Sequence, residues 1–126
     1  MGVGLTLDAG ALIAFERNDR RVTALVKRAR ERAEKLAAPA GVVGQVWRDG
    51  RRQVRLARLL GSGAVEVVAL DDLGARSAGQ LCGTAGTSDV IDASVVLCAR
   101  ARSRRVVTSD PDHLRALDSR IDIIPC

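Results

Sequence analysis

The stretch Leu5-Thr6-Leu7-Asp8, close to the start of the chain, decides the fold. It predicts a short apolar strand that ends at an acidic residue. The residues that follow, Ala9–Arg17, have helical character, with Leu12 and Phe15 among their apolar anchors. The first strand therefore runs directly into a helix, which is how an alternating α/β chain begins.

The rest of the chain continues this alternation. We expect further strands at Leu36–Ala40, Val65–Leu70, Arg105–Ser109 and Ile121–Pro125, and further helices at Arg20–Leu36, Gly41–Trp47, Arg51–Leu60, 72–84, Asp89–Arg102 and Pro111–Leu117. Asp19, Asp71 or Asp72, and Ser88 are the predicted helix caps. Strands that alternate with helices predict an α/β fold with a central parallel sheet of four to five strands and helices on both faces. The length of 126 residues fits a single domain over residues 1–126.

Composition points to a basic protein. The formal net charge is +5 and the isoelectric point is near 10.0. Solvated helix faces and polyanion-binding surfaces both carry clusters of basic residues, but three separate clusters favour nucleic acid. Trp47 and Phe15 are the only aromatic residues, so a base-stacking platform is excluded and a nucleic acid would be held by its phosphates. The clusters lie at 27–35, 48–58 and 100–105.

Other classes of protein fit less well. The cysteines, Cys82, Cys98 and Cys126, have neither a disulfide framework nor a zinc-ligand spacing. The turn at 8–11 lacks the glycines of a dinucleotide-binding fold, and Gly10 stands where a haloacid-dehalogenase-type phosphatase would have a second Asp. A response-regulator receiver, with an acceptor Asp at 71 or 72, fits only loosely. With no leader-like start and no apolar run long enough to cross a bilayer, we expect a cytoplasmic protein without membrane contact.

Acidic residues stand at the ends of the predicted elements. Ligands of open parallel sheets bind beyond the carboxyl ends of the strands, where Asp8 and Asp110 follow two apolar strands. If these strands are neighbours, both carboxylates emerge at one edge. Asp89 and Asp92 share one helix face because they are three residues apart. Carboxylates crowded together raise one another's pKa or require a cation.

Each acid also has a simpler interpretation. Asp89 and Asp112 suit the negative charge favoured at a helix start. Asp92 is harder to explain in this way, because its apolar neighbours predict a largely buried helix in which an unpaired carboxylate is costly. Asp8, which closes an apolar strand, has the same character. The acids better explained as caps and surface charges are Asp19, Asp71, Asp72, Asp118 and Asp122.

The chain resembles a PIN-domain ribonuclease of the VapC type, the toxin of a type II toxin–antitoxin system, over essentially its full length. Residues 7–14 resemble the family's first acidic motif, Asp92-Ala93 with its apolar helix resembles the third, and residues 107–112 resemble the fourth. The second motif normally provides a Glu on the helix after the second strand. This chain has Gln45 at the matching place, and an amide carries no charge and cannot act as a base.

The resemblance implies a PIN-like fold and a metal-dependent endoribonuclease. Asp8, Asp92 and Asp110 would hold Mg²⁺ or Mn²⁺ and, with Gln45, form the catalytic group. Asp89 and Asp112 would be further metal ligands or would position water. Arginines around the rim would hold neighbouring phosphates of the RNA substrate, namely Arg17, Arg48, Arg51 and Arg52.

Partners follow from the same resemblance. A small antitoxin protein would block the acidic pocket, and two copies of the chain would form a homodimer. Trp47 and the segment 54–60 are candidates for such contacts, although intramolecular core is an equally good use of them. Because of Gln45, the alternative is a catalytically weakened PIN-like module that binds RNA or protein.

Overall fold

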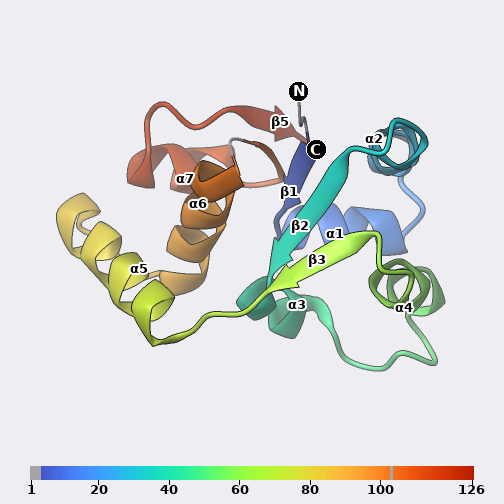
Figure 1. Ribbon diagram of the computed structural model, residues 1–126, viewed down its shortest axis with the longest axis horizontal. Helices are drawn as coiled ribbons and strands as arrows, with labels where there is room; N and C mark the ends of the chain where they lie inside the picture. Colours follow the sequence, from blue (N-terminus) through green and yellow to red (C-terminus); the bar gives the residue numbers. More distant parts are fainter. Residues whose placement is uncertain (1–3, 103) are drawn as a thin grey trace.

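A five-stranded, all-parallel sheet forms the centre of the computed structural model, which describes residues 4–102 and 104–126 (Figure 1). The strand order is β3-β2-β1-β4-β5. The predicted parallel sheet is therefore confirmed, with five strands. Their bounds are β1 Gly4–Leu7, β2 Lys35–Pro39, β3 Val65–Val68, β4 Arg105–Thr108 and β5 Ile123–Pro125.

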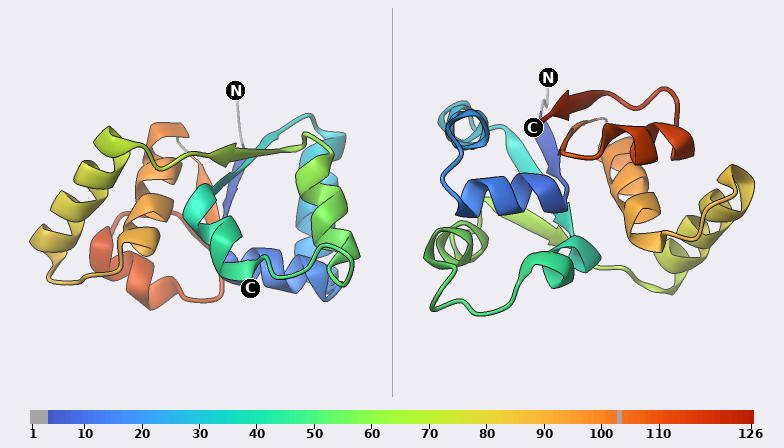
Figure 2. Two further views of the ribbon diagram at one scale, coloured as in Figure 1. Left: turned by 90° about the horizontal axis from the view of Figure 1, so that it is seen from below. Right: turned by 180° about the vertical axis from the view of Figure 1, so that it is seen from behind.

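Helices cover both faces of the sheet, as the sequence predicted. Helices α1, α2 and α4 lie on one side, and α5, α6 and α7 lie on the other (Figure 2). From β1 to β3 the strands are added in one direction, and after β3 the chain returns to add β4 and β5 on the other side of β1. Because connections between parallel strands are right-handed, the helices after β3 lie on the opposite face from those before it. The bounds are α1 Ala9–Glu16, α2 Arg20–Glu31, α3 Ala40–Val46, α4 Val54–Gly61, α5 Asp72–Ala85, α6 Val90–Arg102 and α7 Pro111–Leu117.

The core lies between the sheet and these helices. All four residues of the central strand β1 are buried, and α6 buries Val95 and Val96 completely against the sheet. Leu56 and Leu59 of α4 belong to this core. Trp47, which follows α3, and Val54, the first residue of α4, are 39% and 46% exposed. The segment considered for partner contacts is thus divided between core and surface.

Helix α2 is shorter than predicted. It ends at Glu31 rather than Leu36, because Ala33 has a positive φ of 53° and the Glu34 N–H donates to the Ala29 carbonyl at 2.8 Å. This left-handed turn is usually made by glycine, so an alanine at position 33 gives no sequence signal for it. The early end frees Lys35 to begin β2, where it pairs with Gly4.

Helix α4 begins at Val54, three residues later than predicted. The cause is the side chain of Gln53, whose Oε1 accepts from the backbone N–H groups of Arg48 (2.7 Å) and Asp49 (3.0 Å). Its amide group also donates to the Val46 carbonyl at 2.8 Å. These bonds satisfy backbone groups of the loop that precedes α4.

Within the described residues, no single helix has both the length and the apolar composition to cross a membrane; α5 and α6 meet these criteria only as a pair bent by 108°.

Candidate functional site

An acidic cavity of about 650 Å³ opens at the carboxyl edge of the sheet, where β1 and β4 lie side by side. This is the point at which the strand order reverses, and ligands of open α/β sheets bind there. Among the described residues, no lysine or arginine lines the cavity. Its polar lining includes Asp8, Gln45, Asp89, Asp92, Asp110 and His113.

Asp8 connects β1 to α1 and lies deepest, with only 5% of its surface exposed. Its Oδ1 accepts from the Ala9 N–H at 2.7 Å, so it caps α1, and its Oδ2 accepts from the Thr108 hydroxyl at 2.8 Å. Burial raises the pKa of Asp8, and the nearby carboxylates of Asp110 and Asp89 raise it further, against the effect of the two hydrogen bonds.

Asp89 and Asp92 come from the start of α6. Asp89 Oδ1 accepts from the Asp92 N–H at 2.9 Å, so Asp89 caps this helix and the prediction of Ser88 as its cap was wrong. Asp92 occupies the first turn and is half-buried. Burial raises its pKa to about 6, with further contributions from Asp89, Asp8 and Asp110. Unbalanced negative charge is therefore built into the cavity.

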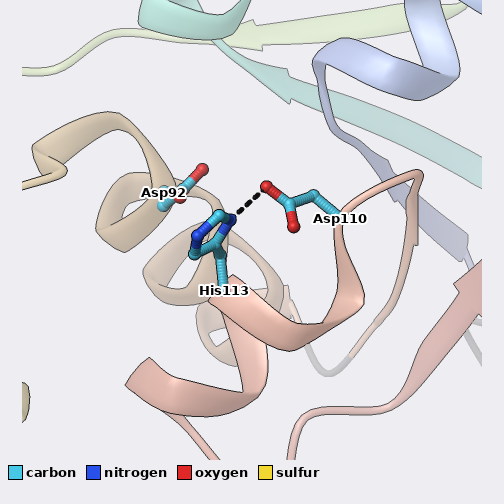
Figure 3. Close-up of side chains that lie close together, drawn as sticks. All are labelled: Asp92, Asp110 and His113. Carbon is cyan, nitrogen blue, oxygen red and sulfur yellow. Dashed lines mark hydrogen bonds and ion pairs between the residues drawn. The ribbon is translucent and has the colours of Figure 1, made fainter.

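Asp110 precedes α7, and its backbone N–H donates to the Thr108 hydroxyl at 2.9 Å. Its carboxylate pairs with Nδ1 of His113, one turn further along the chain (Figure 3). This pairing raises the pKa of His113. One ligand atom from each of Asp92, Asp110 and His113 lies within 4.8 Å of the others.

Thr108 and His113 are not among the site residues predicted from the sequence. The spacing of Asp110 and His113 across the first turn of a predicted helix was the available signal for the histidine. Thr108 carried no comparable signal, because threonine is ordinary in a buried strand.

Gly10 allows the two acidic strand ends to approach each other. A Cβ at this position would collide with the side chain and backbone nitrogen of Ser109. The β1–α1 and β4–α7 junctions therefore pack closely, and this places Asp8 and Asp110 in one cavity.

The remaining predicted residues lie around this centre. Gln45 is exposed on α3 and lines the cavity, whereas Asp112 is exposed on α7 and does not. Arg17 lines a neighbouring hollow that shares Gly10, Ile13 and Ser109 with the acidic cavity.

The other three arginines follow α3, outside the cavity lining. Arg48 donates to the carbonyl oxygens of Gly44 (3.1 Å) and Trp47 (2.7 Å). Arg51 forms an exposed ion pair with Asp49, and Arg52 is exposed.

The fold, with its acidic cavity at the β1–β4 edge, is PIN-like. Two solved structures share this fold. One is the structure of FitAB bound to an IR36 DNA fragment, which is 16% identical to this chain with a TM-score of 0.62; the match covers 96% of this chain and 94% of that chain. FitAcB from Neisseria gonorrhoeae is 17% identical with a TM-score of 0.59, and the match covers 95% and 96% of the two chains.

At these identities the likeness concerns the fold alone, and at that level it confirms the predicted PIN-like fold. No protein-family model matches the sequence, and no curated protein is significantly similar to it.

Proposed function

We propose that this chain is a metal-dependent endoribonuclease, the toxin of a toxin–antitoxin pair. The observation that carries the proposal is the convergence of four aspartates on one cavity that no lysine or arginine of the described residues lines. The acids come from three separate parts of the chain, after β1, at the start of α6 and after β4. The likeness in fold to FitAB and FitAcB supports the same assignment.

The donor set fits a hard divalent ion. Carboxylate oxygens are the ligands that Mg²⁺ and Mn²⁺ favour. Burial, together with neighbouring carboxylates, raises the pKa values of Asp8 and Asp92, and a bound cation would offset this cost of holding negative charge there. Asp8, Asp92 and Asp110 would hold the ion. Asp89 lines the same cavity, with one oxygen engaged in capping α6, and Asp112 would act only from outside the lining.

A bound ion would supply a water of lowered pKa and stabilise charge on the phosphodiester. The protein supplies fixed geometry: the Thr108 hydroxyl and the Ala9 N–H hold the Asp8 carboxylate in one orientation. Gln45 orients water or RNA by hydrogen bonds without taking a proton. Arg17, beside the cavity, and the exposed Arg48, Arg51 and Arg52 hold phosphates of the RNA.

Cleavage of RNA tests this function directly. The purified chain is incubated with structured RNAs and Mg²⁺ or Mn²⁺, with and without a chelator. We expect cleavage that the chelator, Asp8→Asn and Asp92→Asn each abolish. Asp72→Asn is the matched control, because Asp72 occupies the first turn of α5 as Asp92 occupies that of α6, but is exposed and outside the cavity. Cleavage that persists in chelator would refute the proposal.

The same function includes protein partners. Trp47 and Val54 are exposed apolar side chains, suited to contact a small antitoxin or a second copy of the chain. Light scattering of the isolated chain measures whether a homodimer forms, and we expect Val54→Ser to weaken it. An unchanged monomer mass at all concentrations would remove the homodimer from the proposal.

Gln45 favours one second candidate, a PIN-like module that binds RNA or protein without cutting. The residue lines the cavity where a carboxylate would strengthen a cation site, and the amide adds no charge. Calorimetric titration with Mg²⁺ and Mn²⁺ separates the two candidates. Absence of binding at millimolar metal would favour the module over the nuclease.

A further inference from the structure

His113 introduces a nitrogen atom into a cavity otherwise defined by oxygen ligands. Its ring projects from α7 toward Asp92 and Asp110, and one ligand atom of each residue lies within 4.8 Å of the others (Figure 3). The His113 side chain is 72% exposed, so packing does not require a histidine at this position. Its polar contact is with an acid of the cavity itself.

We propose that His113 is a metal ligand and makes this a mixed carboxylate–imidazole centre that selects Mn²⁺ over Mg²⁺. The inference rests on the proposed function, because it concerns the ion of that same site. It goes beyond that function by naming a ligand outside the set of aspartates and by stating which class of ion the site prefers.

Ligand chemistry gives the selectivity its direction. Mg²⁺ binds oxygen donors and water and gains little from imidazole, whereas transition-metal ions accept nitrogen and oxygen donors together. In the ion-free protein the ring pairs with the carboxylate of Asp110 and lies near those of Asp92 and Asp89. A divalent cation shared by the same side chains would replace that pairing.

Direct ligation and mere positioning of Asp110 have different spectroscopic consequences. Pulsed electron paramagnetic resonance of bound Mn²⁺ distinguishes a coordinated ¹⁴N, by its larger hyperfine coupling, from nitrogen atoms that only lie nearby. We therefore expect nitrogen modulation from the full-length protein loaded with Mn²⁺ and its loss in His113→Ala. Because His113 is exposed, this variant should fold normally, and circular dichroism checks that it does.

Calorimetry provides the second measurement. In His113→Ala we expect Mn²⁺ affinity to fall by about tenfold or more and Mg²⁺ affinity by less than about threefold. His113→Asp, which creates an all-oxygen site, should lower the ratio of Mn²⁺ affinity to Mg²⁺ affinity. Arg115→Ala, an exposed change on the same helix but outside the cavity lining, is the matched control and should leave both affinities unchanged.

The outcomes separate this inference from the proposed function. Bound Mn²⁺ without nitrogen modulation, or an affinity ratio that is the same in His113→Ala, overturns the inference while RNA cleavage by the wild-type chain still supports the nuclease. A wild-type chain that binds neither ion refutes both.

Discussion

The hydroxyl of Thr108 on β4 donates a hydrogen bond of 2.8 Å to the buried carboxylate of Asp8 at the end of β1. The same oxygen accepts from the backbone N–H of Asp110 at 2.9 Å. One threonine thus connects two acids that are 102 positions apart in the sequence. Because Thr108 is fully buried, its bond to Asp8 is shielded from water.

Replacing this threonine tests its contribution. Thr108→Val keeps the shape but leaves Asp8 and the Asp110 N–H without their shared partner, so we expect a loss of about 1–3 kcal/mol in the free energy of unfolding, measured in urea. Thr84→Val, at an exposed position on α5, should change stability by less than about 0.5 kcal/mol. Equal effects of the two substitutions would contradict a special role for Thr108.

Removing one charge from the cavity should stabilise the ion-free protein. Asp92 has a pKa raised to about 6 because it is partly buried beside other carboxylates. Asp92→Asn should therefore raise the melting temperature in chelator at neutral pH, by an amount on the order of 1 kcal/mol in stability at this half-exposed position. Thermal unfolding of Asp72→Asn provides the comparison, and a lower melting temperature for Asp92→Asn would show that the carboxylates do not repel.

The pH dependence has a definite sign. Asp92 has a pKa raised from 3.8 to about 6, so the folded state binds more protons than the unfolded state in this window, and the raised pKa of Asp8 acts in the same direction. Stability of the ion-free protein therefore falls as the pH rises through this window. His113, whose pKa is also raised, acts in the same direction.

Thermal unfolding in chelator measures this trend, and we expect a higher melting temperature at about pH 5.5 than at about pH 7.5. Below the window the trend reverses, because Glu66 and Asp118 have lowered pKa values and lose favourable interactions on protonation. With Mn²⁺ present, the metal-induced rise in melting temperature should shrink below about pH 6, since protons compete for Asp92. A melting temperature in chelator that is higher at about pH 7.5 than at about pH 5.5 would be inconsistent with the raised pKa values of Asp8 and Asp92.

Gln45→Glu adds a carboxylate to the cavity lining. We expect tighter Mn²⁺ binding by calorimetry, about tenfold, and faster RNA cleavage, together with a small loss of stability in the ion-free protein from added repulsion. Gln80→Glu, an exposed change on α5 outside the cavity, should have none of these effects. If both variants bind Mn²⁺ equally, position 45 does not influence the metal.

Ala33 offers a test of the fold. Its positive φ of 53° strains a residue with a Cβ, so Ala33→Gly should increase stability by roughly 0.5–1 kcal/mol. Ala24→Gly, at an exposed position inside α2, should decrease it by about 1 kcal/mol. Urea unfolding of the pair measures both, and a destabilised Ala33→Gly would exclude strain at this turn.

Local sequence was sufficient for most of the architecture. The apolar run that ends at Asp8 predicted β1, and Pro111 predicted the start of α7, because strand patterns and helix starts depend on neighbouring residues. The end of α2 was not predictable in this way. It depends on the left-handed turn at Ala33 and on the pairing of β2 with β1, which is a long-range contact.

The site, too, has features that neighbouring residues determine and features that long-range contacts determine. The sequence by itself determined that Asp8 and Asp110 follow apolar strands and that Asp92 lies in an apolar helix, which was enough to predict an acidic edge. Only the tertiary structure decided that Thr108 joins two of these acids and that His113 lies beside Asp92 as well as Asp110. The physical reason is that strand order and the close approach at Gly10 set these distances, and neither is encoded in any short stretch of sequence.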